Sequence, residues 1–194
     1  MKRFVTFEGI DGSGKSTISK LVYKQLKQER DVILTREPTN TWIGKQVQEC
    51  IKTNTDPFVT AFTFIADRID HCRRIQQWLD EGAIVLCDRY AESTYAYQGA
   101  QLEQKMPKSI YWLQDLSKDR ILVPDRTFLF VIEPKESLAR IQHRETLIPF
   151  ERVSFLNKVH NNYLKLAKGP RFVTLDATQS KKTLVDLCCK DILS

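Results

Sequence analysis

A run of eight residues near the start of the sequence has the types and spacing needed to bind phosphate groups. Residues 9–16, GIDGSGKS, fit the pattern G-x-x-x-x-G-K-[ST] and are called the phosphate loop below. Glycines let the backbone curl so that successive N–H groups point at phosphate oxygens, and the start of a following helix adds positive potential. Lys15 would reach the β- and γ-phosphates, and the Ser16 hydroxyl would bind Mg²⁺. The predicted nucleoside triphosphate site consists of Gly9, Asp11, Gly12, Ser13, Gly14, Lys15, Ser16 and Thr17.

The segments on either side of the phosphate loop are those that the pattern requires. Residues 3–7 form a short β-prone run before it, and residues 17–29 follow with apolar side chains at helical spacing. The alternative is a glycine turn that precedes a helix by chance. A strand, a glycine turn and a helix start in succession favour the phosphate-binding interpretation.

The rest of the chain alternates between apolar runs and helical patterns. Further strands are expected at 32–35, 83–87, 127–132 and 171–175, and further helices at 57–80, 93–101, 107–117, 151–168 and 181–193. The continuous apolar run at 83–87 is typical of a parallel strand covered on both faces. We therefore expect an α/β fold of the P-loop type, with about five parallel strands, helices on both faces and one domain over residues 1–194. Ligands bind such sheets beyond the carboxyl ends of the strands.

Two arginines stand where such a ligand would bind. Arg36 comes directly after the strand at 32–35, and Arg89 follows Asp88 at the end of the strand at 83–87. A guanidinium group binds phosphate oxygens in a bidentate way, so the two arginines predict a site for a second phosphate. The alternative for Arg36 is a plain surface charge.

The long helix at 57–80 carries an aromatic and a basic residue on one face. Phe64 and Arg68 are four residues apart, so the ring could stack on a base while the guanidinium bonds to its edge. Each has a structural alternative, because Phe64 could belong to the core and Arg68 could pair with Asp67 or Glu81.

Composition restricts the class of protein without deciding its substrate. Lys and Arg number 30 against 24 Asp and Glu, a charge of +6 that suits small anionic substrates and also nucleic acid. No stretch is long and apolar enough to span a membrane, and no signal peptide precedes the first strand, so we expect no membrane partner. The five cysteines include no C-x-x-C pair, and the three histidines lack metal-ligand spacing. We expect a cytoplasmic protein with reduced thiols and no zinc site.

Five segments of the chain occur in an order that resembles one known family. They are FEGIDGSGKST at 7–17, TREP at 35–38, FIADR at 64–68, DRY at 88–90 and STYAYQG at 93–99. This succession closely resembles the thymidylate kinases, the ATP-dependent dTMP kinases of the nucleoside monophosphate kinase group, over nearly the whole chain. The resemblance implies transfer of the γ-phosphoryl group of ATP to dTMP in dTTP biosynthesis, with Mg²⁺ as cofactor. It also implies a homodimer packed through the long helices.

The resemblance further implies roles for the residues that follow the strands. Arg36 and Arg89 would hold the phosphate of dTMP, with a cis peptide before Pro38 aiming Arg36. Phe64 would stack on thymine, and Arg68 would donate to a thymine carbonyl.

Contacts to the sugar, the base and the metal are implied in the same way. Asp11 resembles the acid that meets the 3′-hydroxyl and helps to organise the metal, and Asp88 resembles the acid that supports Mg²⁺. Tyr97 would crowd the 2′ position and disfavour a ribonucleotide. Thr94 and Gln98 resemble base-edge contacts. The expected dTMP site consists of Arg36, Pro38, Phe64, Arg68, Arg89, Ser93, Thr94, Tyr97 and Gln98.

The catalytic arginine of this family comes either from the phosphate loop or from a lid over the active site. Residues 10–13 contain no arginine, so the short helical lid expected at about 136–152 must supply it. Arg144 is the first candidate and Arg140 the second, whereas Arg152 is interpreted as a solvated helix-face charge. The Asp-Arg pair that bacterial lids carry before an aromatic-Glu pair is missing. The expected catalytic residues are Asp11, Lys15, Arg89, Arg140 and Arg144.

Three other kinds of P-loop protein fit the sequence less well. A regulatory GTPase needs an N-K-x-D motif, and the nearest string, NKVH at 157–160, lacks the acid. A nucleic-acid-linked ATPase calls for a basic stripe with interleaved aromatics. The arginines here follow strands instead, so we expect no nucleic-acid partner. A deoxynucleoside kinase needs a carboxylate base and would leave Arg36 and Arg89 superfluous. The sequence leaves open whether dUMP and other monophosphates are accepted.

Overall fold

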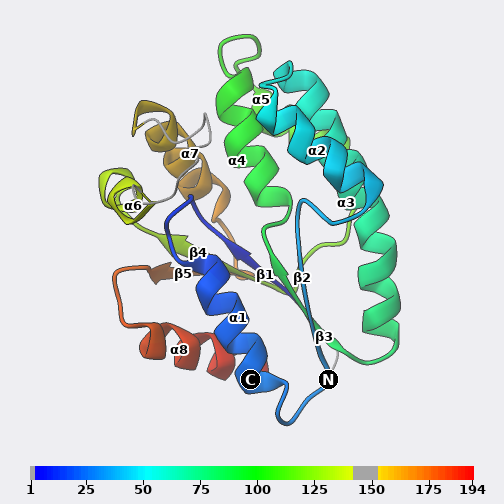
Figure 1. The fold of residues 1–194 in the computed structure, drawn as a ribbon, viewed down its shortest axis with the longest axis vertical. Coiled ribbons are helices and arrows are strands. Elements are labelled where there is room, and N and C mark those ends of the chain that lie inside the picture. The colour runs from blue at the N-terminus through cyan, green and yellow to red at the C-terminus, as the bar shows by residue number, and fades with distance from the viewer. Residues whose placement is uncertain (1–2, 142–152) are drawn as a thin grey trace.

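The chain folds around a parallel sheet with helices on both faces, as predicted (Figure 1). A computed structural model describes residues 3–141 and 153–194. Its five strands lie in the order β2-β3-β1-β4-β5. They are β1 (Arg3–Glu8), β2 (Val32–Arg36), β3 (Ile84–Asp88), β4 (Arg126–Val131) and β5 (Phe172–Asp176). The described helices are α1 (Lys15–Leu26), α2 (Trp42–Lys52), α3 (Pro57–Asp80), α4 (Ala91–Leu102), α5 (Ser109–Ser117), α6 (Pro134–Ile141), α7 (Val153–Leu166) and α8 (Lys181–Leu193).

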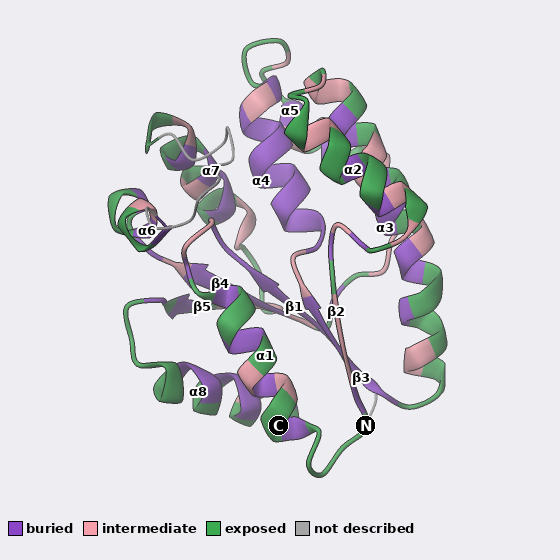
Figure 2. Cartoon of the chain, viewed as in Figure 1, coloured by how far each residue is buried: buried purple, intermediate pink, exposed green. Residues whose placement is uncertain are grey.

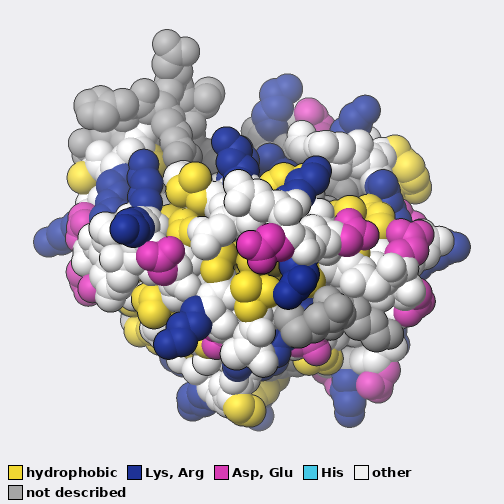
Figure 3. All heavy atoms as spheres, turned by 90° about the horizontal axis from the view of Figure 1, so that it is seen from below, with side chains coloured by type: hydrophobic (Ala, Val, Ile, Leu, Met, Phe, Trp, Pro, Cys, Tyr) yellow, Lys and Arg dark blue, Asp and Glu magenta, His cyan; other side chains and the backbone are white. Residues whose placement is uncertain are grey.

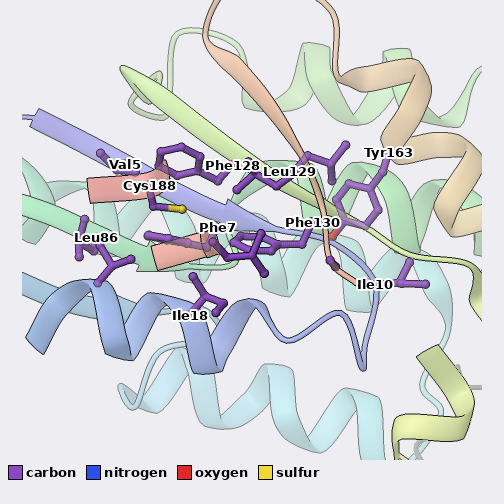
Figure 4. Packing of buried hydrophobic residues seen from close by; sticks show 14 of the residues in the cluster. Val5, Phe7, Ile10, Ile18, Leu86, Phe128, Leu129, Phe130, Tyr163 and Cys188 are labelled. Atoms are coloured by element: carbon purple, nitrogen blue, oxygen red, sulfur yellow. The ribbon is translucent and has the colours of Figure 1, made fainter. Parts of the chain in front are cut away.

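The central strands are apolar on both faces, which is why they lie in the middle of the sheet. Figure 2 shows β1, β3, β4 and α4 almost wholly buried, whereas the other helices have exposed residues. Phe7 of β1 packs against Phe128 and Phe130 of β4, with ring centroids 5.6 and 6.2 Å apart. Ile18 of α1 covers this layer from one side (Figure 4). Burial of these large side chains stabilises the sheet and fixes the strand ends relative to one another.

The strand register brings the predicted functional segments to one edge of the sheet. Phe7 of β1 is paired with Asp88 of β3, and Asp88 is paired in turn with Arg36 of β2. The segments that follow these three strands therefore start side by side. This is the edge at which parallel sheets bind ligands.

The bounds of most elements agree with the sequence-based expectation. All five strands are confirmed to within one residue at each end, and α3 and α8 have the predicted bounds. Helix α1 begins two residues earlier than expected, because Gly14 takes a left-handed conformation with φ 86° directly before Lys15. Of the expected lid, the structure describes α6, and residues 142–152 lie outside the described residues.

Helix α2 was not predicted from the sequence. Ile43, Val47 and Ile51 recur every four residues along it, so a helical pattern was present in the sequence and was missed. Only Gly44 and Val47 of this helix are buried. Its first turn is capped by Thr41, whose hydroxyl accepts from the Gly44 N–H at 3.2 Å.

The surface shows no sign of a membrane-spanning segment in the part of the chain that is described. None of the described helices is both long and apolar enough to cross a membrane. On the face drawn in Figure 3, Lys and Arg side chains are interspersed with Asp and Glu side chains. On that face, therefore, the excess positive charge is spread rather than gathered.

Candidate active site

A pocket of about 970 Å³ opens at the carboxyl ends of β1, β2 and β3. Its walls come from the phosphate loop, from the segments after β2 and β3, and from α3, α4 and α6. The predicted residues that line it are Asp11, Gly12, Gly14, Lys15, Ser16, Thr17, Arg36, Pro38, Phe64, Arg68, Asp88, Arg89, Ser93, Tyr97, Gln98 and Arg140. Gly9, Ser13 and Thr94 are buried behind this wall. Arg144 lies outside the described residues.

The phosphate loop depends on glycine conformations that other residues rarely adopt. Gly12 has a φ of 80°, and a Cβ there would collide with the carbonyl oxygen of Ser137 in α6. The Ser137 hydroxyl also donates to the carbonyl of Asp11. Helix α6 therefore packs directly on the phosphate loop, so the first part of the expected lid contacts the predicted ATP site.

Lys15 is buried at the base of the phosphate loop. Its Nζ donates to the carbonyl of Ile10 at 3.3 Å and lies 3.8 Å from Oδ1 of Asp11. Burial lowers the pKa of Lys15 to about 8, with the charge of Arg89 acting in the same direction and Asp11 against it. Phosphate groups bound nearby would favour the ammonium form, so this environment suits an anionic ligand.

Asp11 and Arg89 form an ion pair at the pocket wall. Arg89 has a φ of 70°, and its Nη1 donates to the Ser93 hydroxyl at 3.1 Å. The Tyr97 hydroxyl donates to Oδ2 of Asp11 at 3.0 Å. Burial alone would raise the pKa of Asp11, but the charges of Arg89 and Lys15 outweigh it and lower that pKa to about 2. Asp11 is therefore ionised at ordinary pH, and it holds Arg89 and Tyr97 beside it.

Arg68 is almost wholly buried, and its ion-pair partner is not the one expected. Its Nε donates to Oε2 of Glu37 at 2.8 Å, and its Nη2 donates to the Thr94 hydroxyl at 2.9 Å. The alternative that Arg68 pairs with Asp67 or Glu81 is therefore wrong. Its Nη1 has no hydrogen-bond partner among the described residues, so that nitrogen can donate to a ligand in the pocket.

The neighbours of Arg68 on α3 hold the segment that follows β2. Asp67 accepts from the Thr39 N–H at 2.8 Å and from the Thr39 hydroxyl at 2.6 Å. Glu37 is paired with Nδ1 of His71 at 3.0 Å as well as with Arg68. Helix α3 thus bonds to the segment after β2 at Glu37 and at Thr39, one on each side of Pro38.

Arg36 and Phe64 are the more open residues of the predicted dTMP site. Arg36 is exposed at the end of β2, and the Glu37–Pro38 peptide bond that follows is cis, as predicted. Phe64 is half-buried in the pocket wall and does not join either of the two described core clusters. Both side chains are thus accessible to a ligand.

Two buried oxygens at the pocket lack hydrogen-bond partners in the described part of the chain. They are Oδ1 of Asp88 and Oε1 of Gln98, and both residues line the pocket. Buried polar atoms in proteins normally have partners, so each of these oxygens is available to a ligand or a water molecule. A carboxylate oxygen suits a metal ion or its water, and an amide oxygen suits an N–H donor.

Comparison with known sequences decides the family. The sequence model of thymidylate kinases matches residues 7–187. The chain belongs to the thymidylate kinase family. Among curated relatives, it is 40% identical to a probable thymidylate kinase of Methanosarcina barkeri, over 98% of this chain and 96% of that protein. It is 39% identical to one of Methanococcoides burtonii, over 98% of this chain and 94% of that protein.

Membership of the thymidylate kinase family confirms the resemblance on which the site was predicted, and it also directs attention to residues that were missed. Glu37 bonds to Arg68, His71 bonds to Glu37, and Ser137 contacts the phosphate loop. Glu37 had a usable signal, because it lies in a short polar segment after a strand. His71 also had one, because it follows Arg68 by three residues on the same helical face. Ser137 had none, since its contact depends on how α6 packs back onto the loop.

Proposed function

We propose that the pocket binds ATP and dTMP side by side and transfers the γ-phosphoryl group of ATP to dTMP, giving ADP and dTDP. This is the reaction of the thymidylate kinase family, to which the chain belongs, and it is a step in dTTP synthesis. The meeting of Lys15 and Arg89 at Asp11 is the observation that carries the assignment of roles. Lys15 belongs to the donor site and Arg89 to the acceptor site, so two phosphate groups would meet where these cations converge.

The chemistry needs positioning and charge neutralisation rather than a covalent intermediate. A bond forms between an oxygen of the dTMP phosphate and the γ-phosphorus, while the bond from that phosphorus to the bridging oxygen of ADP breaks. The attacking oxygen is already anionic, so no general base is required. Lys15 would neutralise charge on the phosphates of ATP, while Arg36 and Arg89 hold the acceptor in line.

Ser16 and Asp88 would hold Mg²⁺ together with the phosphates of ATP. Ser16 lines the pocket in the first turn of α1, and Asp88 has the buried oxygen without a partner described above. Magnesium is usually bound by one or two protein oxygens, by substrate phosphates and by water, and this pair fits that pattern. When bound, Mg²⁺ neutralises phosphate charge and orients the reacting groups. Within residues 3–141 and 153–194, no cluster of three or more His, Cys, Asp or Glu side chains could hold a metal ion.

Thymine would be selected over other bases by one hydrogen-bond donor and one acceptor of the protein. The free Nη1 of Arg68 suits the 4-oxo group of thymine, and the free Oε1 of Gln98 suits its ring N–H. Cytosine has an amino group and an unprotonated nitrogen at these positions, so both contacts would become mismatched. Phe64 would stack on the base. At the sugar, Asp11 would accept from the 3′-hydroxyl and Tyr97 would crowd the 2′ position.

A panel of acceptors tests this function directly. With ATP and Mg²⁺, we expect rapid ADP formation with dTMP, slower formation with dUMP, and no phosphorylation of thymidine, which brings no acceptor phosphate. The rate with dCMP should be lower than with dTMP by on the order of 10²- to 10⁴-fold, because a buried donor and acceptor would be left unpaired. Coupled-enzyme detection of ADP measures all four. Equal ADP formation with every compound would contradict the proposal and leave an ATPase with an unknown acceptor.

The catalytic arginine of the lid stays a prediction. The Nη1 of Arg140 donates to the carbonyl of Ala177 at 3.1 Å, and its Nη2 is paired with Glu136 at 2.9 Å. Arg140 would have to leave these partners to reach the γ-phosphate. Arg144, the first candidate, remains the preferred one.

We further propose a cytoplasmic homodimer formed through α3. Val59, Phe62 and Ile69 are 50%, 51% and 36% exposed, large values for apolar side chains. They are spaced by three and seven residues, so they share one helical face with the exposed Ala66. An apolar stripe of this kind is typical of a surface covered by a partner.

Placing a charge in the middle of this stripe should dissociate the dimer. Ala66→Asp removes no packing within the chain, because Ala66 is exposed, but it would bury a carboxylate between two apolar faces. Light scattering at micromolar concentration should give the mass of the dimer for the unsubstituted protein and the mass of one 22.6 kDa chain for the variant. Val123→Asp, at a residue that is 75% exposed elsewhere on the surface, is the matched control and should remain dimeric. A monomeric unsubstituted protein would contradict the homodimer.

A further inference from the structure

Glu8, the last residue of β1, is a carboxylate with no exposed surface, and it does not line the pocket. Its Oε1 accepts from the Tyr90 N–H at 2.7 Å and the Ser93 N–H at 3.2 Å. Its Oε2 accepts from the Ser93 hydroxyl at 2.6 Å and the Tyr163 hydroxyl at 3.0 Å. Three of these four donors belong to the turn between β3 and α4 and to the first turn of α4, so Glu8 fixes this segment against the end of β1.

The same carboxylate replaces a missing helix cap. Tyr90 is the N-cap residue of α4, but its side chain makes no capping hydrogen bond to the helix. Glu8 supplies the acceptor that the first N–H groups of a helix need, and its charge lies favourably at the positive end of the helix dipole. The start of α4 is thus held by a residue from another element.

Arg89 is tied to this arrangement on two sides. Its N–H donates to the carbonyl of Phe7 at 3.0 Å, next to the Tyr90 N–H that Glu8 holds. Its Nη1 donates to the Ser93 hydroxyl, which itself donates to Glu8. Both the backbone and the guanidinium of Arg89 therefore depend on groups that Glu8 orients.

We propose that Glu8 is a positioning residue for phosphoryl acceptance, which acts through Ser93 and the β3–α4 turn to aim the Arg89 guanidinium at the phosphate of dTMP. This inference rests on the proposed function, because the contact of Arg89 with that phosphate is part of it. Glu8 touches neither substrate, so its effect should appear in the binding and alignment of dTMP and not in the binding of ATP.

The ionised form of Glu8 is costly to the fold, because its carboxylate is buried away from water. Burial raises the pKa of Glu8 to about 7, with Glu92 acting in the same direction and Arg89 against it. The other groups that face it are Ser93, Tyr90, Cys87 of β3, Tyr163 of α7 and Lys15 of α1. A carboxyl whose pKa is higher in the folded than in the unfolded chain destabilises the fold once it is ionised. Stability from this source therefore falls as the pH rises from about 4.5 through about 7.

Glu8→Gln is the variant that separates positioning from a structural role. The amide keeps the size and one oxygen of the carboxylate, but its NH₂ must donate where Oε2 accepted, so the Ser93 hydroxyl can no longer donate there. We expect the KM for dTMP to rise about 10- to 100-fold, whereas the KM for ATP changes by less than about twofold. The Tm of the variant relative to that of the unsubstituted protein should rise as the pH is raised from 5 to 8. Glutamine does not titrate, so the variant avoids the cost of an ionised buried carboxylate.

Two further variants sharpen the test. Ser93→Ala should raise the KM for dTMP in the same way, and the double variant should be no worse than the more affected single one, because both act through one contact. Glu92→Gln is the matched control: Glu92 is another buried carboxylate of this region, paired with Arg171 and not with Arg89. It should leave the KM for dTMP unchanged.

The possible outcomes are distinguishable. An unchanged KM for dTMP in Glu8→Gln would overturn the inference, as would additive effects with Ser93→Ala. Equal losses for dTMP and ATP together with lower stability at pH 8 would show a purely structural role and overturn it too. No phosphorylation of dTMP by the unsubstituted protein would instead overturn the proposed function.

Discussion

Replacing Arg89 with lysine should lower kcat/KM for dTMP by on the order of 10²- to 10³-fold, with little change in the KM for ATP. The guanidinium contacts the Asp11 carboxylate, the Ser93 hydroxyl and the Gly9 carbonyl from one planar group. A lysine ammonium is a point charge that cannot satisfy this set and also bind phosphate in a bidentate way. The charge is kept, so the loss reports geometry. Initial rates with each substrate varied at saturating concentration of the other measure it.

The control for this variant is Arg120→Lys. Arg120 is exposed, and among the described residues its guanidinium bonds to the nearby carbonyls of Leu116 and Lys118. It should leave both KM values unchanged. A dTMP efficiency within about threefold of the unsubstituted protein for Arg89→Lys would place the acceptor phosphate elsewhere, with Arg36 as the remaining candidate.

Replacing Lys15 with methionine should lower kcat by on the order of 10³-fold, while dTMP still binds. Lys15 is buried, and its ammonium group lies close to the Ile10 carbonyl and to Asp11 inside the phosphate loop. Methionine retains the apolar stem but removes the charge that would neutralise the transferring group. Single-turnover kinetics with ATP measures the chemical step, and equilibrium dialysis with dTMP measures acceptor binding.

Lys24→Met on the same helix is the matched control, because Lys24 is exposed and does not line the pocket. It should behave as the unsubstituted protein. If Lys15→Met kept kcat within about tenfold, the phosphate loop would bind nucleotide without taking part in the transfer, and the assignment of the donor site would be wrong.

The Lys15 and Arg89 substitutions should impair different steps of the reaction, although both change a cation beside Asp11. The Lys15 ammonium and the Arg89 guanidinium approach the same carboxylate, from α1 and from the β3–α4 turn respectively. If donor and acceptor phosphates meet there, the lysine variant is defective in transfer and the arginine variant in dTMP use. The same defect in both would mean that Asp11 joins one site and not two.

Local patterns were enough to predict most of the fold. The phosphate loop is a contiguous run whose glycines and lysine act on backbone neighbours, so its sequence contains nearly all of its geometry. The strands were predicted because buried parallel strands need continuous apolar side chains. The bounds of α3 follow from Pro57 at its start, its apolar stripe and Gly82 after its end. Helix α2 was missed although Ile43, Val47 and Ile51 recur at helical spacing within it.

The candidate site was predicted as a set of residues, but not as a network. Spacing along the chain and the family resemblance placed Arg68 and Arg89 at the pocket. Neither could show that Arg68 is paired with Glu37, 31 residues away, or that Arg89 bonds to Ser93 and Asp11. A side chain with several possible partners takes the one that strand register and helix packing bring within reach.

What the sequence by itself determined is therefore the order of the strands and of most helices along the chain, the phosphate loop and the types of side chain after each strand. Each of these depends on residues close together in the chain. What only the tertiary structure decided is which of those side chains meet. Glu8 reaches Ser93 across 85 positions, and Ser137 reaches Asp11 across 126. Such contacts leave no periodic pattern in the sequence, because they arise when the sheet sets the register of its strands and the helices pack against it.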